Sequence, residues 1–125
     1  TVEPGDVFEA AGFEVRACGG LHAVNHPDIP RVPNLGYLVE GEVYHPGDSF
    51  DPPSGVEVGT LFVPISAPWL KLAEAIEFTR AVRPRRAYAL HDGILNDRGL
   101  KIVNTHLARL SGTDYAWLQP GTTIN

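Results

Sequence analysis

"LGYLVEGEVYHPGD", residues Leu35–Asp48, is the stretch that decides the fold. Aliphatic and aromatic residues stand on both sides of Gly41, which predicts two strands joined by a turn at that glycine. Pro46 and Gly47 form a second turn pair, so the second strand ends there and Asp48 follows it directly. The stretch therefore predicts a hairpin that presents a carboxylate at its end, although Pro-Gly-Asp alone is also ordinary turn chemistry.

The rest of the chain alternates strands with helices after this hairpin. The continuous apolar run "TLFVPI" is typical of a strand that is covered on both faces. Strands are expected over residues 6–10, 13–18, 36–40, 42–45, 60–65, 86–91 and 115–118, and helices from after Pro68 to about Val82 and over 100–110. This order predicts an α/β fold with a mixed β-sheet and two helices packed on one face.

Two helices on one face leave the other face of the sheet open. The runs "TLFVPI" and "YALH" are too apolar for one side to remain in water. We therefore expect a further element to cover the second face. No repeat or long linker divides the chain, so residues 1–125 are expected to form a single unit.

Composition excludes several classes of function. The chain has 125 residues and a net charge of -5, which argues against broad nucleic-acid binding because phosphate binders usually carry a basic surplus. Its only cysteine, Cys18, excludes an internal disulfide, and no secretory signal pattern or apolar run of roughly 18 residues is present. We expect a cytoplasmic protein without a membrane segment.

Three side chains that can bind metals stand at the ends of predicted strands: His22, Asp48 and His91. In open α/β sheets the loops beyond the carboxyl ends of strands converge on the site. Histidine and carboxylate together suit zinc, manganese or iron(II). A carboxylate can also bridge two cations through its two oxygens. Each residue has a plainer interpretation as well, as a core histidine, a turn former or a loop residue.

Four motifs around these residues resemble the later motifs of the metallo-β-lactamase superfamily, and the UlaG-like metal-dependent hydrolases of actinobacteria in particular. They are "GGLHAV" at 19–24, "GYLVEGEVYHPGDS" at 36–49, "LFVPIS" at 61–66 and "ALHDG" at 89–93. The resemblance implies that His22 completes one metal site, that Asp48 bridges both metals and orients the attacking hydroxide, and that His91 completes the second site. It also implies two ions, zinc first and manganese or iron as alternatives.

The chain departs from the family at one point. The family's HxHxDH motif, which supplies ligands to both metals, is absent, and no two histidines here lie two residues apart. The resemblance then implies that this chain is the C-terminal half of an αββα sandwich. The missing N-terminal half would supply both the second sheet and the remaining ligands.

Other polar residues receive supporting or structural interpretations. His45 is placed to orient Asp48 or is a surface histidine, and Asp92 is placed to bind substrate or to support the neighbouring ligand. His26 and His106 are expected to be structural.

Three functions stay open. The first is a hydrolase of a small-molecule ester, lactone, amide or phosphoester, with this chain as part of it. The second is a catalytically incomplete half-domain that pairs with its own copy as a structural or binding module. The third is phosphoester or RNA processing, in which the arginines at positions 80, 83, 85 and 86 would bind phosphate groups. The favourable position of cations at a helix C-terminus explains the same arginines without such a function.

Overall fold

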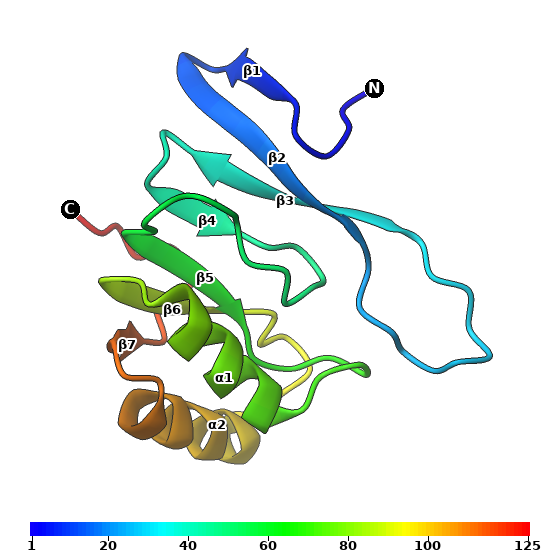
Figure 1. The fold of residues 1–125 in the computed structure, drawn as a ribbon. Coiled ribbons are helices and arrows are strands. Elements are labelled where there is room, and N and C mark those ends of the chain that lie inside the picture. Colours follow the sequence, from blue (N-terminus) through cyan, green and yellow to red (C-terminus); the bar gives the residue numbers. More distant parts are fainter.

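The computed structural model of the chain describes residues 1–125 as a seven-stranded sheet with two helices (Figure 1). The strands lie in the sheet in chain order, β1 to β7. They are β1 Val7–Ala10, β2 Phe13–Leu21, β3 Pro33–Val39, β4 Val43–His45, β5 Thr60–Pro64, β6 Arg86–Leu90 and β7 Asp114–Ala116, and the helices are α1 Leu72–Val82 and α2 Asp97–Leu110.

The sheet changes from antiparallel to parallel halfway across. Strands β1 to β4 form an antiparallel meander, and β4 to β7 are parallel. Tight turns can join antiparallel neighbours, whereas parallel neighbours need a crossover. Helices α1 and α2 supply two of these crossovers, between β5 and β6 and between β6 and β7. The predicted mixed sheet is confirmed.

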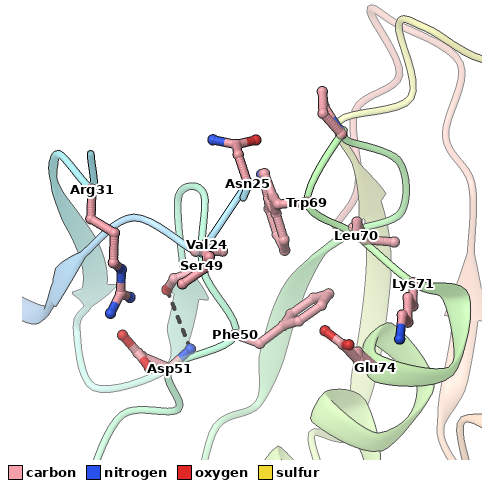
Figure 2. Close-up of a pocket in the computed structure, with 12 residues that line it drawn as sticks. Val24, Asn25, Arg31, Ser49, Phe50, Asp51, Trp69, Leu70, Lys71 and Glu74 are labelled. Carbon is pink, nitrogen blue, oxygen red and sulfur yellow. Dashed lines mark hydrogen bonds between the residues drawn. The ribbon is translucent and has the colours of Figure 1, made fainter. Parts of the chain in front are cut away.

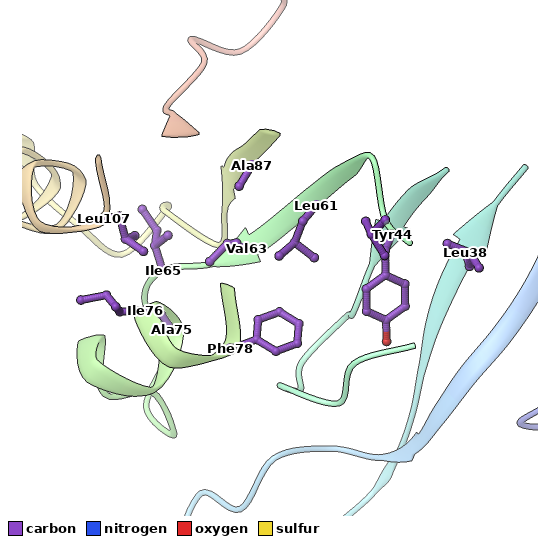
Figure 3. Close-up of a cluster of buried hydrophobic side chains, with 11 residues drawn as sticks. Leu38, Tyr44, Leu61, Val63, Ile65, Ala75, Ile76, Phe78, Ala87 and Leu107 are labelled. Atoms are coloured by element: carbon purple, nitrogen blue, oxygen red, sulfur yellow. The ribbon is translucent and has the colours of Figure 1, made fainter. Parts of the chain in front are cut away.

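Both helices pack on the same face of the sheet and share one core with it (Figure 3). Tyr44, Leu61 and Val63 from the sheet are fully buried in this core. Phe78 of α1 and Leu107 of α2 close it from the helix side. The helical spacing of apolar residues thus predicts the correct face of each helix.

The opposite face of the sheet carries a row of aromatic rings and no helix. Because side chains alternate along a strand, burial of Leu61 in the core directs its neighbour Phe62 to the other face. The ring of Phe62 lies 6.0 Å from that of His45 and 6.2 Å from that of Tyr88. These rings are not enclosed by the helices, as the sequence predicts.

Some strand limits differ from the prediction. Strand β2 continues to Leu21, because Gly19 and Gly20 stay paired with β3 although glycine disfavours strands. Strand β6 ends at Leu90 and not at His91, whose φ of +65° is outside the extended region. Neither α1 nor α2 has the length and apolar character that a membrane-spanning helix needs.

Candidate metal centre

The three predicted ligands meet at one edge of the sheet, the border that the carboxyl ends of several strands form. Strands β2, β4 and β6 run in the same direction, so their carboxyl ends share this edge. The Nε2 atom of His22 lies 3.7 Å from Oδ2 of Asp48, and Nε2 of His91 lies 2.6 Å from Oδ1 of the same carboxylate. Asp48 therefore stands between two imidazoles that come from distant parts of the chain.

His22 is fixed in the tautomer that a metal ligand needs. Its Nδ1 lies 2.6 Å from the carbonyl oxygen of Ala23, and because a carbonyl only accepts, Nδ1 must carry the proton. In the neutral ring Nε2 then presents a lone pair toward Asp48. Two such acceptors cannot hydrogen-bond to each other, and ligands of one tetrahedral ion lie about 3.4 Å apart, close to the separation seen. This backbone contact is typical of metal-binding histidines.

The carboxylate of Asp48 carries the clearest sign of a missing partner. The side chain as a whole is 35% exposed, but its Oδ1 atom is buried and has no hydrogen bond of acceptable geometry. His91 approaches this oxygen to 2.6 Å without directing a donor at it. A buried oxygen without a partner is costly. The donor set of two imidazoles and one carboxylate fits a divalent cation, which would satisfy this atom.

His91 holds a strained backbone conformation. Its φ of +65° lies in the left-handed region that residues with a Cβ rarely adopt. Strain of this kind costs on the order of 1–3 kcal/mol and is concentrated at functional sites. Here the conformation ends β6 abruptly and places the imidazole against Asp48.

Asn34 positions the turn that carries Asp48. The side-chain oxygen of Asn34 accepts a hydrogen bond of 2.9 Å from the amide of Asp48, and its Nδ2 donates to the carbonyl of Pro46 at 3.0 Å. The backbone oxygen of Asp48 also accepts from Ala23 at 2.8 Å, which ties this turn to the loop of His22. Sequence reasoning missed Asn34. The one sequence signal for Asn34 was that asparagine, which is uncommon in strands, stands in the middle of an apolar stretch.

The two supporting candidates contact other partners. His45 accepts a hydrogen bond from the amide of Gly47 through Nδ1 at 3.1 Å, so it touches the turn and not the carboxylate of Asp48. Desolvation lowers the pKa of His45, and the nearby His91 lowers it further. Asp92 accepts from the indole Nε1 of Trp117 at 2.6 Å. Their predicted roles stay predictions, and Trp117 is a contact that sequence reasoning missed.

The remaining candidates are occupied elsewhere or isolated. His26 lies beside Asp28 on an exposed loop, at 3.8 Å, and Cys18 is a free, partly buried thiol. No group of three or more His, Cys, Asp or Glu side chains is placed to hold a metal ion, so His22, Asp48 and His91 do not form a metal site by themselves. The three candidate ligands thus form a partial set.

Three of the four arginines near the end of α1 make internal contacts. Arg80 pairs with Glu77 at 2.8 Å and Arg85 pairs with Glu42. Arg86 donates from Nε to the hydroxyl of Thr60 at 3.0 Å. These contacts favour the structural interpretation of the cluster over a role in gripping phosphates.

Comparisons with known proteins agree with this architecture. The family described as the β-lactamase superfamily domain matches residues 1–91. Protein Rv0786c of Mycobacterium tuberculosis is 40% identical over 128 residues, which covers 98% of this chain and 60% of that protein. The chain therefore spans about 60% of the length of this curated relative.

Solved structures show the same fold at low sequence identity. Igni18, a metallo hydrolase from Ignicoccus hospitalis, has a TM-score of 0.68 at 18% identity over 98% of this chain and 58% of its own. CmlA, a diiron β-hydroxylase from Streptomyces venezuelae, has a TM-score of 0.62 at 16% identity over 91% of this chain and 32% of its own. These matches lead to one assignment: the chain belongs to the β-lactamase superfamily and has the fold of its metal-dependent members.

Proposed function

We propose that this chain is the C-terminal part of a metal-dependent hydrolase, with His22, Asp48 and His91 as metal ligands. The observation that carries the proposal is the Asp48 carboxylate, which lies between the imidazoles of His22 and His91 and whose buried Oδ1 has no hydrogen bond of acceptable geometry. Two zinc ions are the preferred occupants, with manganese or iron as alternatives, since these donor types suit all three metals. CmlA, which shares this fold, is a diiron enzyme, and this supports iron as one of the alternatives.

The chemistry supplied by such ions is a water of lowered pKa, available for attack on an ester, lactone, amide or phosphoester. The residues of this chain would hold and orient the centre. Asp48 offers one oxygen to each side, His22 keeps its Nε2 lone pair free by donating from Nδ1, and the left-handed backbone of His91 fixes its imidazole.

The proposal also states that other residues complete the site. Three ligands do not make a dinuclear centre, and one face of the sheet carries aromatic rings without a covering helix. An N-terminal half with the family's histidine motif would supply both the ligands and the second sheet. The related Mycobacterium tuberculosis protein is longer than this chain, which leaves room for such a half.

Zinc titration of the 125-residue chain, followed by the NMR signals of its five histidines, tests the ligand assignment. We expect the imidazole signals of His22 and His91 to shift together while that of His26 does not. Asp48→Asn should abolish these shifts, whereas Asp28→Asn, an exposed carboxylate beside a histidine, should leave them unchanged. Equal shifts in both variants would show that Asp48 is not a ligand.

Metal content after dialysis then tests the completeness of the site. We expect well below two ions per chain, because the chain alone offers a partial ligand set. Two ions per chain would mean that a copy of the chain supplies the missing ligands.

The alternative is a half-domain that pairs with a second copy through its open face. The aromatic row of Phe62 and Tyr88 favours it. Sedimentation of the 125-residue chain at increasing concentration distinguishes the two proposals. If the chain stays monomeric although no N-terminal half has been added, self-pairing is excluded. Small-molecule substrates and a cytoplasmic location remain predictions of the hydrolase proposal.

A further inference from the structure

A hollow opens beside the candidate metal centre (Figure 2). Its volume is about 520 Å³, within the range of sites for small organic ligands. Ala23 and Ser49, the direct chain neighbours of His22 and Asp48, line it. A ligand in this hollow would therefore lie next to the proposed metals.

An aromatic wall connects the metal centre with the hollow. The indole of Trp69 is only 9% exposed and meets the ring of His22 edge-on at 6.1 Å. On the other side it meets Phe50 at 5.1 Å and 73°. Edge-to-face contacts and burial hold Trp69 in place. The wall is a preformed apolar surface for part of a ligand.

Charged side chains of both signs surround this wall. In Figure 2, Arg31 and Asp51 lie on one side of the rings, and Lys71 and Glu74 lie on the other. Two cations and two carboxylates balance, so the hollow does not attract simple anions or cations by net charge. None of the four belongs to a salt bridge. Each is free to bind a charged group of a ligand.

The first pair is anchored to the candidate site. Arg31 donates from Nε to the backbone oxygen of His22 at 2.8 Å, which leaves its terminal nitrogens for a ligand. The backbone of Asp51 is held by the hydroxyls of Ser49 and Tyr44, at 3.3 and 2.6 Å. A planar guanidinium is the preferred partner of a carboxylate. A neighbouring aspartate is a matching partner for an ammonium group.

We propose that this hollow binds a zwitterionic amino compound with an apolar side chain, such as an apolar amino acid or a short peptide. Its carboxylate contacts Arg31, its ammonium contacts Asp51, and its side chain lies on Phe50 and Trp69. One part of the proposal rests on the proposed hydrolase function, namely that this compound is part of the substrate or product. Binding itself involves no metal ligand.

Fluorescence of Trp69 measures this binding directly. The chain has two tryptophans, so Trp117→Phe leaves Trp69 as the only indole. The probes are L-phenylalanine, 3-phenylpropionate, which lacks the ammonium group, and 2-phenylethylamine, which lacks the carboxylate. All titrations are made with a chelator present, so that they do not depend on metal binding.

We expect L-phenylalanine to bind about tenfold more tightly than either analogue, the loss expected for one charge-assisted hydrogen bond. In the Arg31→Gln variant, L-phenylalanine should bind no more tightly than 2-phenylethylamine. In the Asp51→Asn variant, L-phenylalanine should bind no more tightly than 3-phenylpropionate. Arg98→Gln, on exposed helix surface, is the matched control and should change neither.

Two results would overturn the proposal. Equal affinity for L-phenylalanine and 3-phenylpropionate would make the hollow a simple anion site. No fluorescence change with any probe, in a variant whose circular dichroism matches the parent chain, would exclude an amino-acid ligand. The zinc titration that tests Asp48 is a separate measurement, so neither of these results decides the hydrolase proposal.

Discussion

Substitution of Gly47 by alanine tests how the turn presents Asp48. Gly47 has a φ of +68°, and a Cβ added there would lie 2.4 Å from Oδ1 of Asn34 and 3.1 Å from the oxygen of Leu35. Gly55 has almost the same φ, +69°, but nothing lies within 4 Å of its added Cβ. The two glycines therefore separate backbone strain from crowding.

The expected loss of stability follows from these contacts. A left-handed backbone costs a residue with a Cβ about 1 kcal/mol, which both variants share. At Gly47 the new methyl also displaces the Asn34 amide, which bonds to Asp48 and Pro46. Two such hydrogen bonds contribute about 1 kcal/mol each. We expect Gly47→Ala to lower the free energy of unfolding by about 3 kcal/mol.

Urea unfolding of both variants measures this difference. Gly55→Ala should lose only about 1 kcal/mol, which leaves about 2 kcal/mol for crowding. The double variant with Asn34→Ala gives a further check, because Gly47→Ala should cost only the backbone term once the amide is gone. Equal losses in the two glycine variants would refute the reasoning, and Asn34 would then not hold the turn.

Four further predictions concern other residues. Trp117→Phe removes the exposed hydrogen bond to Asp92 and should lower the free energy of unfolding by about 1 kcal/mol in urea. Tyr44→Phe leaves the carbonyl of Asp51 without its donor and should cost about 1–3 kcal/mol. Burial raises the pKa of Tyr44 above its usual value, so the folded chain keeps this proton after the unfolded chain has lost it. Stability should be constant at neutral pH and fall above about pH 10, and thermal melts should show a shallower fall in the phenylalanine variant. Leu61→Ala, in the fully buried core, should cost about 2–5 kcal/mol.

The hairpin and the strand-end residues were predictable because their signals are local. Glu40 and Gly41, the central residues of the turn that the amide of Glu42 closes onto the carbonyl of Val39, both have positive φ. The strand directions then bring His22, Asp48 and His91 to one edge. A pattern of alternating strands and helices is sufficient to predict this convergence, since it follows from topology and not from details of packing.

The supporting contacts were not predictable, because they join residues whose proximity depends on the finished fold. Asn34 meets Asp48 only after β3 and β4 have paired in register. Trp117 reaches Asp92 only after β7 has joined the sheet. Neither position carries a sequence signal for its partner. The extension of β2 was also hidden, because glycines reduce strand propensity even where their backbone stays paired.

We propose one physical explanation for the open face and the partial ligand set. Phe62 and Tyr88 form part of an apolar surface that a folded protein rarely leaves in water. On the adjoining edge, Asp48 keeps a buried oxygen that His91 approaches without a hydrogen bond of acceptable geometry. A second sheet that packed on the aromatic rings would bring its own loops to this same edge, because loops follow the ends of strands. One missing element would thus cover the face and supply the remaining ligands, whereas a ligand set completed by solvent would leave the rings unexplained.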